Sequence, residues 1–417
     1  MLVAEDNGVS LSVEREQAAP LLLLVFAFVL VMVDGYDIFI VSFLVPLITA
    51  ELNLTHMSVG QIFAAGLTGS MLGGMVLGPL ADRFGRRPVL TLSLAIAGVA
   101  TILCSTASSF GALAAYRLIA GFALSGVLAA VIPLVAEHFP KEKRNTAVTM
   151  MFVGFPCGAV VGGALTSMLI HYGWRTLFVG AGMLTLAVVP SAFLLKESLA
   201  DTRPRGGIEG GRTGRISSIR ALFTEGRLWA TICMMFGVFC MLLVSYLLNS
   251  WTPMIAVRSG MSPASAALCG VFLNLGGIVG ALGSTIVVRK YGLFRPVAVM
   301  VVLGAVAIAM LGQLTQTSTM LFAGLFVVGL LAIGANQNSP AMAVDVYPQT
   351  IRATGTGWQF AVGRLGAITG PLIGGQLLTW QVGSENLFII VAIPTLLAAV
   401  AYGAIEFVKP KEQTSGS

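Results

Sequence analysis

The run LLLLVFAFVLVMVDGYDIFIVSFLVPLITA, residues 21–50, decides the fold class because it is long, apolar and carries only two charges. About 20 apolar residues are enough to cross the hydrocarbon core of a bilayer as a helix. The rest of the chain has the same character: of 417 residues, 56% are hydrophobic and 10% are charged, against about 25% charged in a soluble domain. The sequence therefore predicts an all-α polytopic membrane protein.

Further apolar runs follow the first, separated by polar or turn-forming residues. The twelve predicted transmembrane helices are 21–50, 59–81, 88–105, 110–139, 147–170, 176–195, 228–256, 266–288, 296–313, 320–344, 355–378 and 386–407. The interruption over 196–227 is the longest and is rich in Gly and Arg, which is typical of a flexible linker. It divides two expected six-helix bundles, 21–195 and 228–407, with tails at 1–20 and 408–417.

The basic residues predict the orientation. If the N-terminus is cytoplasmic, only Arg175 and Arg258 of the 24 lysines and arginines lie outside, and Arg117 and Arg364 fall within spans. All the others lie on the cytoplasmic side, which is the positive-inside bias of membrane proteins. Both tails and the linker are therefore expected in the cytoplasm, and the net charge of +6 requires no nucleic-acid partner.

The two halves carry the same spaced motif. Glu137-x-x-Pro-x-x-x-Arg144 ends the fourth span, and Asp345-x-x-Pro-x-x-x-Arg352 ends the tenth, at an offset of 345 − 137 = 208. The same offset relates Gly158 to Gly366 and Gly162 to Gly370. Parallel six-span repeats are a recurring plan of transporters, with the substrate site between the halves.

Asp34 and Asp37 lie near the middle of the first span, one turn apart on the same helical face. An acid at the centre of a membrane helix costs ~2.5–3.5 kcal/mol on insertion scales, so neither is expected to face lipid. Two close carboxylates resist double ionisation, and one of them can therefore hold a proton near neutral pH. We interpret the pair as proton-coupling, with a structural ion pair to a neighbouring span as the alternative.

Arginines within spans need anionic partners, because a guanidinium does not lose its proton. Arg117 either joins the proton-coupling acids or extends to the outer headgroups. Arg364 has the planar fork that matches a carboxylate, so we expect it to bind an acidic substrate or to pair with Asp34 or Asp37. The other candidates for substrate binding, for which interhelical hydrogen bonding is an equal alternative, are Asp37, Tyr246, Asn249, Asn338 and Gln359.

Four stretches resemble one known family. Gly78-Pro-Leu-Ala-Asp82-Arg83-Phe-Gly85-Arg86-Arg87, after the second span, resembles the loop signature of the major facilitator superfamily. Asp34-Gly-Tyr-Asp37, Tyr116-Arg-Leu-Ile-Ala-Gly121 and the string from Arg352 to Pro371 resemble its aromatic acid:proton symporter branch. The resemblance implies the major facilitator fold, in which two six-helix bundles enclose a central site, and it implies that Arg117 approaches the acids of the first span.

The resemblance also implies a gate at the cytoplasmic ends of the spans, closed when the protein faces outward. The charged residues expected to form it are Asp82, Arg86, Glu137, Arg144, Asp345 and Arg352. Carboxylate–guanidinium pairs at a wet surface can exchange partners at little cost. The alternative is that these charges only determine topology, which does not explain the repeated acid–Pro–Arg spacing.

The function implied by the resemblance is proton-coupled uptake of an aromatic carboxylic acid, such as a benzoate, hydroxybenzoate or phenylpropionate, across a bacterial inner membrane. A proton-coupled efflux antiporter is the alternative, and a transporter-like membrane sensor is one from another class, although the linker and tails leave no room for a signalling domain. No phosphate-binding loop, metal-ligand cluster or nucleophile–base pair is apparent, so we expect no enzyme, metal or cofactor. The expected partners are the substrate, protons and lipids, and the expected state is a monomer.

Overall fold

The computed structural model describes residues 6–192, 220–224, 226–315 and 317–409, without the side chains of 6–20, 141, 142, 145 and 353. The predicted linker lies mostly outside these residues, and the predicted tails lie partly outside them. The first half contains α1 (Asp6–Leu52), α2 (His56–Phe84), α3 (Arg86–Cys104), α4 (Phe110–His138), α5 (Lys141–Leu169), η1 (Ile170–Tyr172) and α6 (Trp174–Ala192). The second half contains α8 (Leu228–Arg258), α9 (Pro263–Tyr291), α10 (Phe294–Leu314), α11 (Ser318–Val328), η3 (Gly329–Ile333), α12 (Gly334–Asn336), α13 (Ser339–Val346), α14 (Arg352–Thr379) and α15 (Ser384–Val408).

The prediction of an all-α membrane fold is confirmed. In the described part of the chain, 11 helical segments are long and apolar enough to cross a membrane, one of them built from α11 to α13. The remaining long helix, α14, has 28 residues but is less apolar, because it carries Gln359, Arg364 and many glycines. It packs between α8 and α2, so the protein itself surrounds its polar residues.

The tenth predicted span, 320–344, is not one regular helix. A π-helical turn, η3, follows α11, and the chain turns again at Gln337 and Asn338 before α13 begins. At this break the hydroxyl of Tyr402 in α15 donates to the side-chain Oδ1 of Asn336 at 2.9 Å. Interrupted helices at membrane depth occur where the surrounding protein satisfies the freed polar groups.

The quoted loop signature turns sharply between α2 and α3. Gly85 ends α2 with φ +97°, a conformation that favours glycine, and its N–H donates to the carbonyl of Ala81. Gly292 occupies the matching place between α9 and α10, with φ +89° and its N–H bonded to Val288 O. The loop at Arg289-Lys-Tyr-Gly292 has no acid that corresponds to Asp82 of the first loop, but it keeps the turn.

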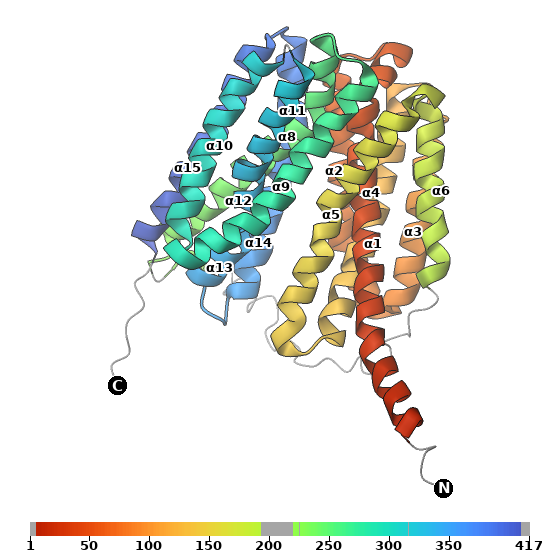
Figure 1. Ribbon diagram of the computed structural model, residues 1–417, viewed down its shortest axis with the longest axis vertical. Coiled ribbons are helices and arrows are strands. Elements are labelled where there is room, and N and C mark those ends of the chain that lie inside the picture. Colours follow the sequence, from red (N-terminus) through yellow and green to blue (C-terminus); the bar gives the residue numbers. More distant parts are fainter. Residues whose placement is uncertain (1–5, 193–219, 225, 316, 410–417) are drawn as a thin grey trace.

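The helix packing repeats between the halves. In the first half α1 packs on α5, α2 on α4 and α3 on α6; in the second half α8 packs on α14, α9 on α11 and η3, and α10 on α15. Figure 1 shows the two groups side by side, with the start of α1 and the end of α15 at the same end of the molecule. We call this the terminal end and the opposite one the far end.

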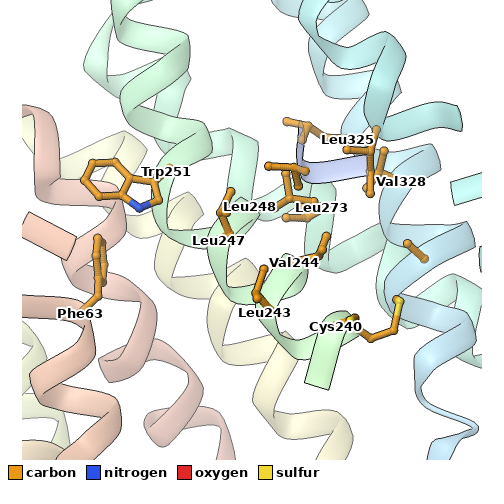
Figure 2. Packing of buried hydrophobic residues seen from close by; sticks show 14 of the residues in the cluster. Phe63, Cys240, Leu243, Val244, Leu247, Leu248, Trp251, Leu273, Leu325 and Val328 are labelled. Atoms are coloured by element: carbon orange, nitrogen blue, oxygen red, sulfur yellow. The ribbon is translucent and has the colours of Figure 1, made fainter. Parts of the chain in front are cut away.

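Close contacts between the halves lie toward the far end. Ser42 of α1 donates to the carbonyl oxygens of Asn249 and, at 3.2 Å, of Ser250 in α8. Trp251 of α8 points toward Phe63 of α2 (Figure 2), with ring centroids 6.0 Å apart. A Cβ placed on Gly60 would lie 2.8 Å from the carbonyl oxygen of Pro371 in α14. This seam between α1, α2, α8 and α14 joins the halves, together with the packing of α5 on α9.

Glycines let paired helices touch backbone to backbone. A Cβ on Gly158 of α5 would lie 2.0 Å from the carbonyl oxygen of Met32 in α1, and one on Gly366 of α14 would lie 2.2 Å from that of Phe239 in α8. The repeat offset relates these two glycines, so the same close approach is built twice. Such small-residue contacts are a common way to pack membrane helices.

Gly158→Ala is expected to separate α5 from α1, because its methyl group would meet main-chain atoms that cannot turn away. Overpacking of this kind costs about 1–3 kcal/mol or more, so the unfolding temperature of the purified protein should fall by several degrees. Gly180→Ala in α6 is the matched control, since nothing lies within 4 Å of its Cβ position. Equal melting temperatures for the two variants would contradict the close α1–α5 packing.

Candidate functional site

Asp37 of α1 and Arg117 of α4 form a buried ion pair. Arg117 Nη2 lies 2.7 Å from Asp37 Oδ2, and Nη1 lies 3.2 Å from Oδ1. Nη2 also donates to the main-chain carbonyl of Asp37 at 2.7 Å. The two residues are 2% and 3% exposed, so neither snorkels toward the membrane surface. The structure brings these two predicted residues together.

A third helix completes this contact. Thr101 of α3 donates its hydroxyl to Asp37 Oδ1 at 2.6 Å, and the Cys104 thiol one turn later contacts Arg117. Arg117 passes Gly66 of α2 on its way to α1, and a Cβ on Gly66 would lie 4.0 Å from Arg117 Nε. The carboxylate therefore receives three hydrogen bonds through its two oxygens, all from helices of the first half.

Asp34, one turn before Asp37, has a different environment. It is 2% exposed, yet among the described residues it forms no hydrogen bond and no ion pair. It interacts electrostatically with Arg364 of α14 and with Asp37 and Arg117 of its own half. Tyr246 of α8 interacts with both Asp34 and Arg364. The structure thus gathers three predicted groups of the first half and two of the second at one place.

Arg364 has hydrogen-bonding capacity to spare. Its Nη1 atom is buried and has no hydrogen-bond partner within the described chain. An unpaired buried donor on a charged group is costly, and charge-assisted hydrogen bonds are the strong ones. This atom is accordingly suited to an anionic ligand held between the two halves.

Aromatic and apolar side chains adjoin these charges. The ring of Phe39 lies 5.6 Å from that of Phe155 and 5.9 Å from that of Tyr246, measured between centroids. A small pocket next to this group is lined from both halves by Ile38, Phe39, Val41, Ile62, Phe63, Gly66, Leu67, Arg117, Gly121, Tyr246 and Ser250. Apolar walls with a few placed polar groups are typical of small-molecule sites.

The predicted amide candidates serve mainly to join helices. Asn249 donates to Ser245 O at 2.8 Å and accepts from Asn274 of α9 at 2.7 Å. Asn338 lies against α9 and donates to Ser284 Oγ at 2.8 Å, and none of its described contacts involves the Asp34–Arg364 group. Gln359 donates to Ser339 O at 2.9 Å, but its Oε1 atom is buried without a described partner.

The predicted gate residues lie at the terminal end, and those that are paired have partners in their own half. Arg86 of α3 forms a two-pronged contact with Glu137 of α4, with Nη2 and Oε1 2.7 Å apart. Asp345 accepts from Lys409 at 2.6 Å. Arg352 donates to the carbonyl of Tyr347 at 3.3 Å. Asp82 and Arg144 are exposed.

Sequence reasoning did not single out Thr101, Ser42 or the Phe39–Phe155 contact. A threonine or a serine in an apolar span carries no distinguishing signal, because either can bond to its own helix. Among the described residues no group of three or more His, Cys, Asp or Glu side chains could hold a metal ion.

Arg117→Met is expected to leave the carboxylate of Asp37 buried without its counter-ion. Breaking a buried pair in this way costs about 3–5 kcal/mol, whereas replacing both members by apolar groups is often nearly neutral. The double variant Asp37→Leu/Arg117→Met should therefore melt at a higher temperature than the single variant. Thermal unfolding of the purified proteins tests this, and an undisturbed melting temperature for Arg117→Met would mean that the pair does not anchor the first half.

Comparison with known proteins shows the family. The sequence model of the family described as "Major Facilitator Superfamily" matches residues 27–339 and 295–417 of the chain. The chain is 33% identical over 405 residues to a gallate transporter of Pseudomonas putida, covering 91% of this chain and 90% of that one. It is also 33% identical over 377 residues to the 3-(3-hydroxy-phenyl)propionate transporter of Escherichia coli (strain K12), covering 90% and 91%.

Solved structures agree on the fold. A bacterial homolog of the human lysosomal transporter Spinster matches with a TM-score of 0.75 at 17% identity, over 95% of this chain and 99% of that one. A D-xylose–proton symporter matches with a TM-score of 0.74 at 17% identity, over 94% and 98%. The chain therefore belongs to the major facilitator superfamily of transporters, and its relatives at 33% identity confirm the predicted resemblance to the aromatic-acid transporters of that superfamily.

Proposed function

We propose that this protein is a secondary active transporter that takes up an aromatic carboxylic acid together with protons. The observation that carries the proposal is the unpartnered, buried Nη1 of Arg364, which lies in one electrostatic group with Asp34 and Tyr246. A carboxylate is the ligand that a guanidinium fork matches best. Arg364 would hold the acid, and the acids of α1 would handle protons.

The ring of the substrate would lie against aromatic side chains. Tyr246 adjoins Phe39, which in turn contacts Phe155, so an apolar surface begins beside the charged group. Offset or edge-to-face contacts between aromatic rings contribute about 0.5–1.5 kcal/mol beyond the burial of area. The names of the relatives, which are transporters of gallate and of a phenylpropionate, support this choice of substrate class.

The proposed orientation has the terminal end in the cytoplasm, and the distribution of the basic residues supports it. The far end then faces outside, and the seam around Ser42, Trp251 and Gly60 closes the path to that side. In the opposite state the seam would open, and the terminal ends of the halves would meet. Arg86, Glu137, Asp345 and their neighbours would then exchange partners within one half for partners across the halves.

Efflux by proton antiport uses the same architecture, and transport direction separates the two mechanisms. Proteoliposomes containing the purified protein should accumulate a labelled aromatic acid when the outside is more acidic than the inside. Addition of a protonophore should abolish this accumulation. Accumulation under the reversed gradient alone would instead indicate antiport.

Arg364→Lys is expected to raise the concentration of acid needed for half-maximal uptake by about 10–100-fold, because Lys keeps the charge but loses one of two parallel hydrogen bonds worth about 1.5–3 kcal/mol. Arg295→Lys is the matched control, since Arg295 is largely exposed and pairs with Glu406. Uptake measured at several concentrations of the acid gives the half-saturating concentration of each variant. Equal half-saturation for Arg364→Lys and the wild-type protein would remove Arg364 from the substrate site.

A further inference from the structure

We propose that the two acids of α1 have separate tasks: Asp34 exchanges the transported proton, and Asp37 is the fixed counter-ion of Arg117 within the first half. The inference rests on the proposed function and specifies how its site works. Both acids were predicted to couple protons, and sequence alone does not distinguish them. Their partners in the structure do.

Asp37 is the counter-ion of Arg117, and its hydrogen bonds hold it in that role. Its Oδ1 accepts from Thr101 at 2.6 Å and from Arg117 at 3.2 Å, and its Oδ2 accepts from Arg117 at 2.7 Å. Loss of the negative charge of Asp37 would leave the buried guanidinium of Arg117 without its counter-ion. Thr101, Arg117 and Asp37 all belong to the first half, so a movement of one half against the other leaves their contacts intact.

Asp34 is free to change its charge. It forms no hydrogen bond or ion pair with the described residues, and the charged and titratable groups that act on it are Arg364 on α14, Tyr246 on α8, and Asp37 and Arg117 on its own half. The cation from the second half, Arg364, moves relative to Asp34 whenever the halves move. The charge that Asp34 experiences therefore depends on the state of the transporter.

Arg364 links substrate and proton. Without substrate, its positive charge favours the ionised form of Asp34. A substrate carboxylate on Nη1 neutralises that charge, and Asp34 is then left beside the negative charges of Asp37 and the substrate. Asp34 consequently takes up a proton from water, forming one O–H bond. The binding of the proton and the binding of the substrate acid therefore each raise the affinity for the other. This linkage is what symport requires.

The test measures the affinity of the purified full chain for an aromatic acid between pH 5.5 and 8.5. The probe is whichever of gallate, 4-hydroxybenzoate, benzoate and 3-(3-hydroxyphenyl)propionate binds best to the wild-type protein. Affinity of the wild type should rise as the pH falls, by at least about fivefold, which is the lower end of typical coupling factors. Asp34→Asn, which mimics the protonated acid, should bind tightly with an affinity that does not change with pH.

Three further variants complete the experiment. Asp37→Asn and Thr101→Val should both lower the melting temperature. Thr101→Val, which keeps the charges of Asp37 and Arg117, should also keep the pH dependence of binding. The control Glu385→Gln, which removes an exposed acid of α15, should change neither property. Thr101→Val leaves every charge in place, so it tests Asp37 even if Asp37→Asn does not fold. A steep profile in Asp34→Asn, or a flat one in Thr101→Val, would overturn the inference while leaving the proposed function intact. Failure of the wild type to bind any of the acids would overturn both.

Discussion

The buried contact of Asp37 with Arg117 is the interaction on which the site depends. A charged pair without water is tolerated only when both partners are fully hydrogen-bonded, and here Thr101 supplies the remaining donor. Meeting that requirement fixes α1, α3 and α4 relative to one another, because each helix contributes one member. The position of Asp34, one turn away on α1, is thereby fixed as well. The first half thus presents an unpaired acid from a rigid frame.

The repeat conserves the packing but not the charges. The offset of 208 relates the close glycine contacts of α1 with α5 to those of α8 with α14. Applied to the charged residues, it leads from Asp37 to Ser245, from Arg117 to Leu325 and from Arg364 back to Pro156. Each half therefore carries charged groups that the other lacks. In the proposed mechanism two similar scaffolds move against each other, with Asp34 and Asp37 on one side of the seam and Arg364 on the other.

The sequence predicted what the membrane makes compulsory. Long apolar runs are stable only as spans, and Arg117 needs an anionic partner, because an unpaired guanidinium at that depth is too costly. It could not predict choices that are equally satisfied in several ways. Thr101 could have bonded to its own helix, Asn338 could have faced α14 instead of α9, and the break at η3 has no proline to announce it. The unequal surroundings of Asp34 and Asp37 are of this kind, because they depend on which neighbours approach which turn.

The two ends of the molecule use different contacts, which suits a protein that must open each of them in turn. The seam at the far end consists of backbone close approaches and buried rings, such as Gly60 against Pro371 and Phe63 against Trp251. The terminal end carries partly exposed pairs such as Arg86 with Glu137, each worth about 0–1 kcal/mol. In the second half Lys409, stacked over Phe294, takes the place of that arginine and pairs with Asp345. Under the proposed function, weak pairs that can change partners would keep the two states close in free energy, and the binding of a proton and an acid would then be enough to shift the balance between them.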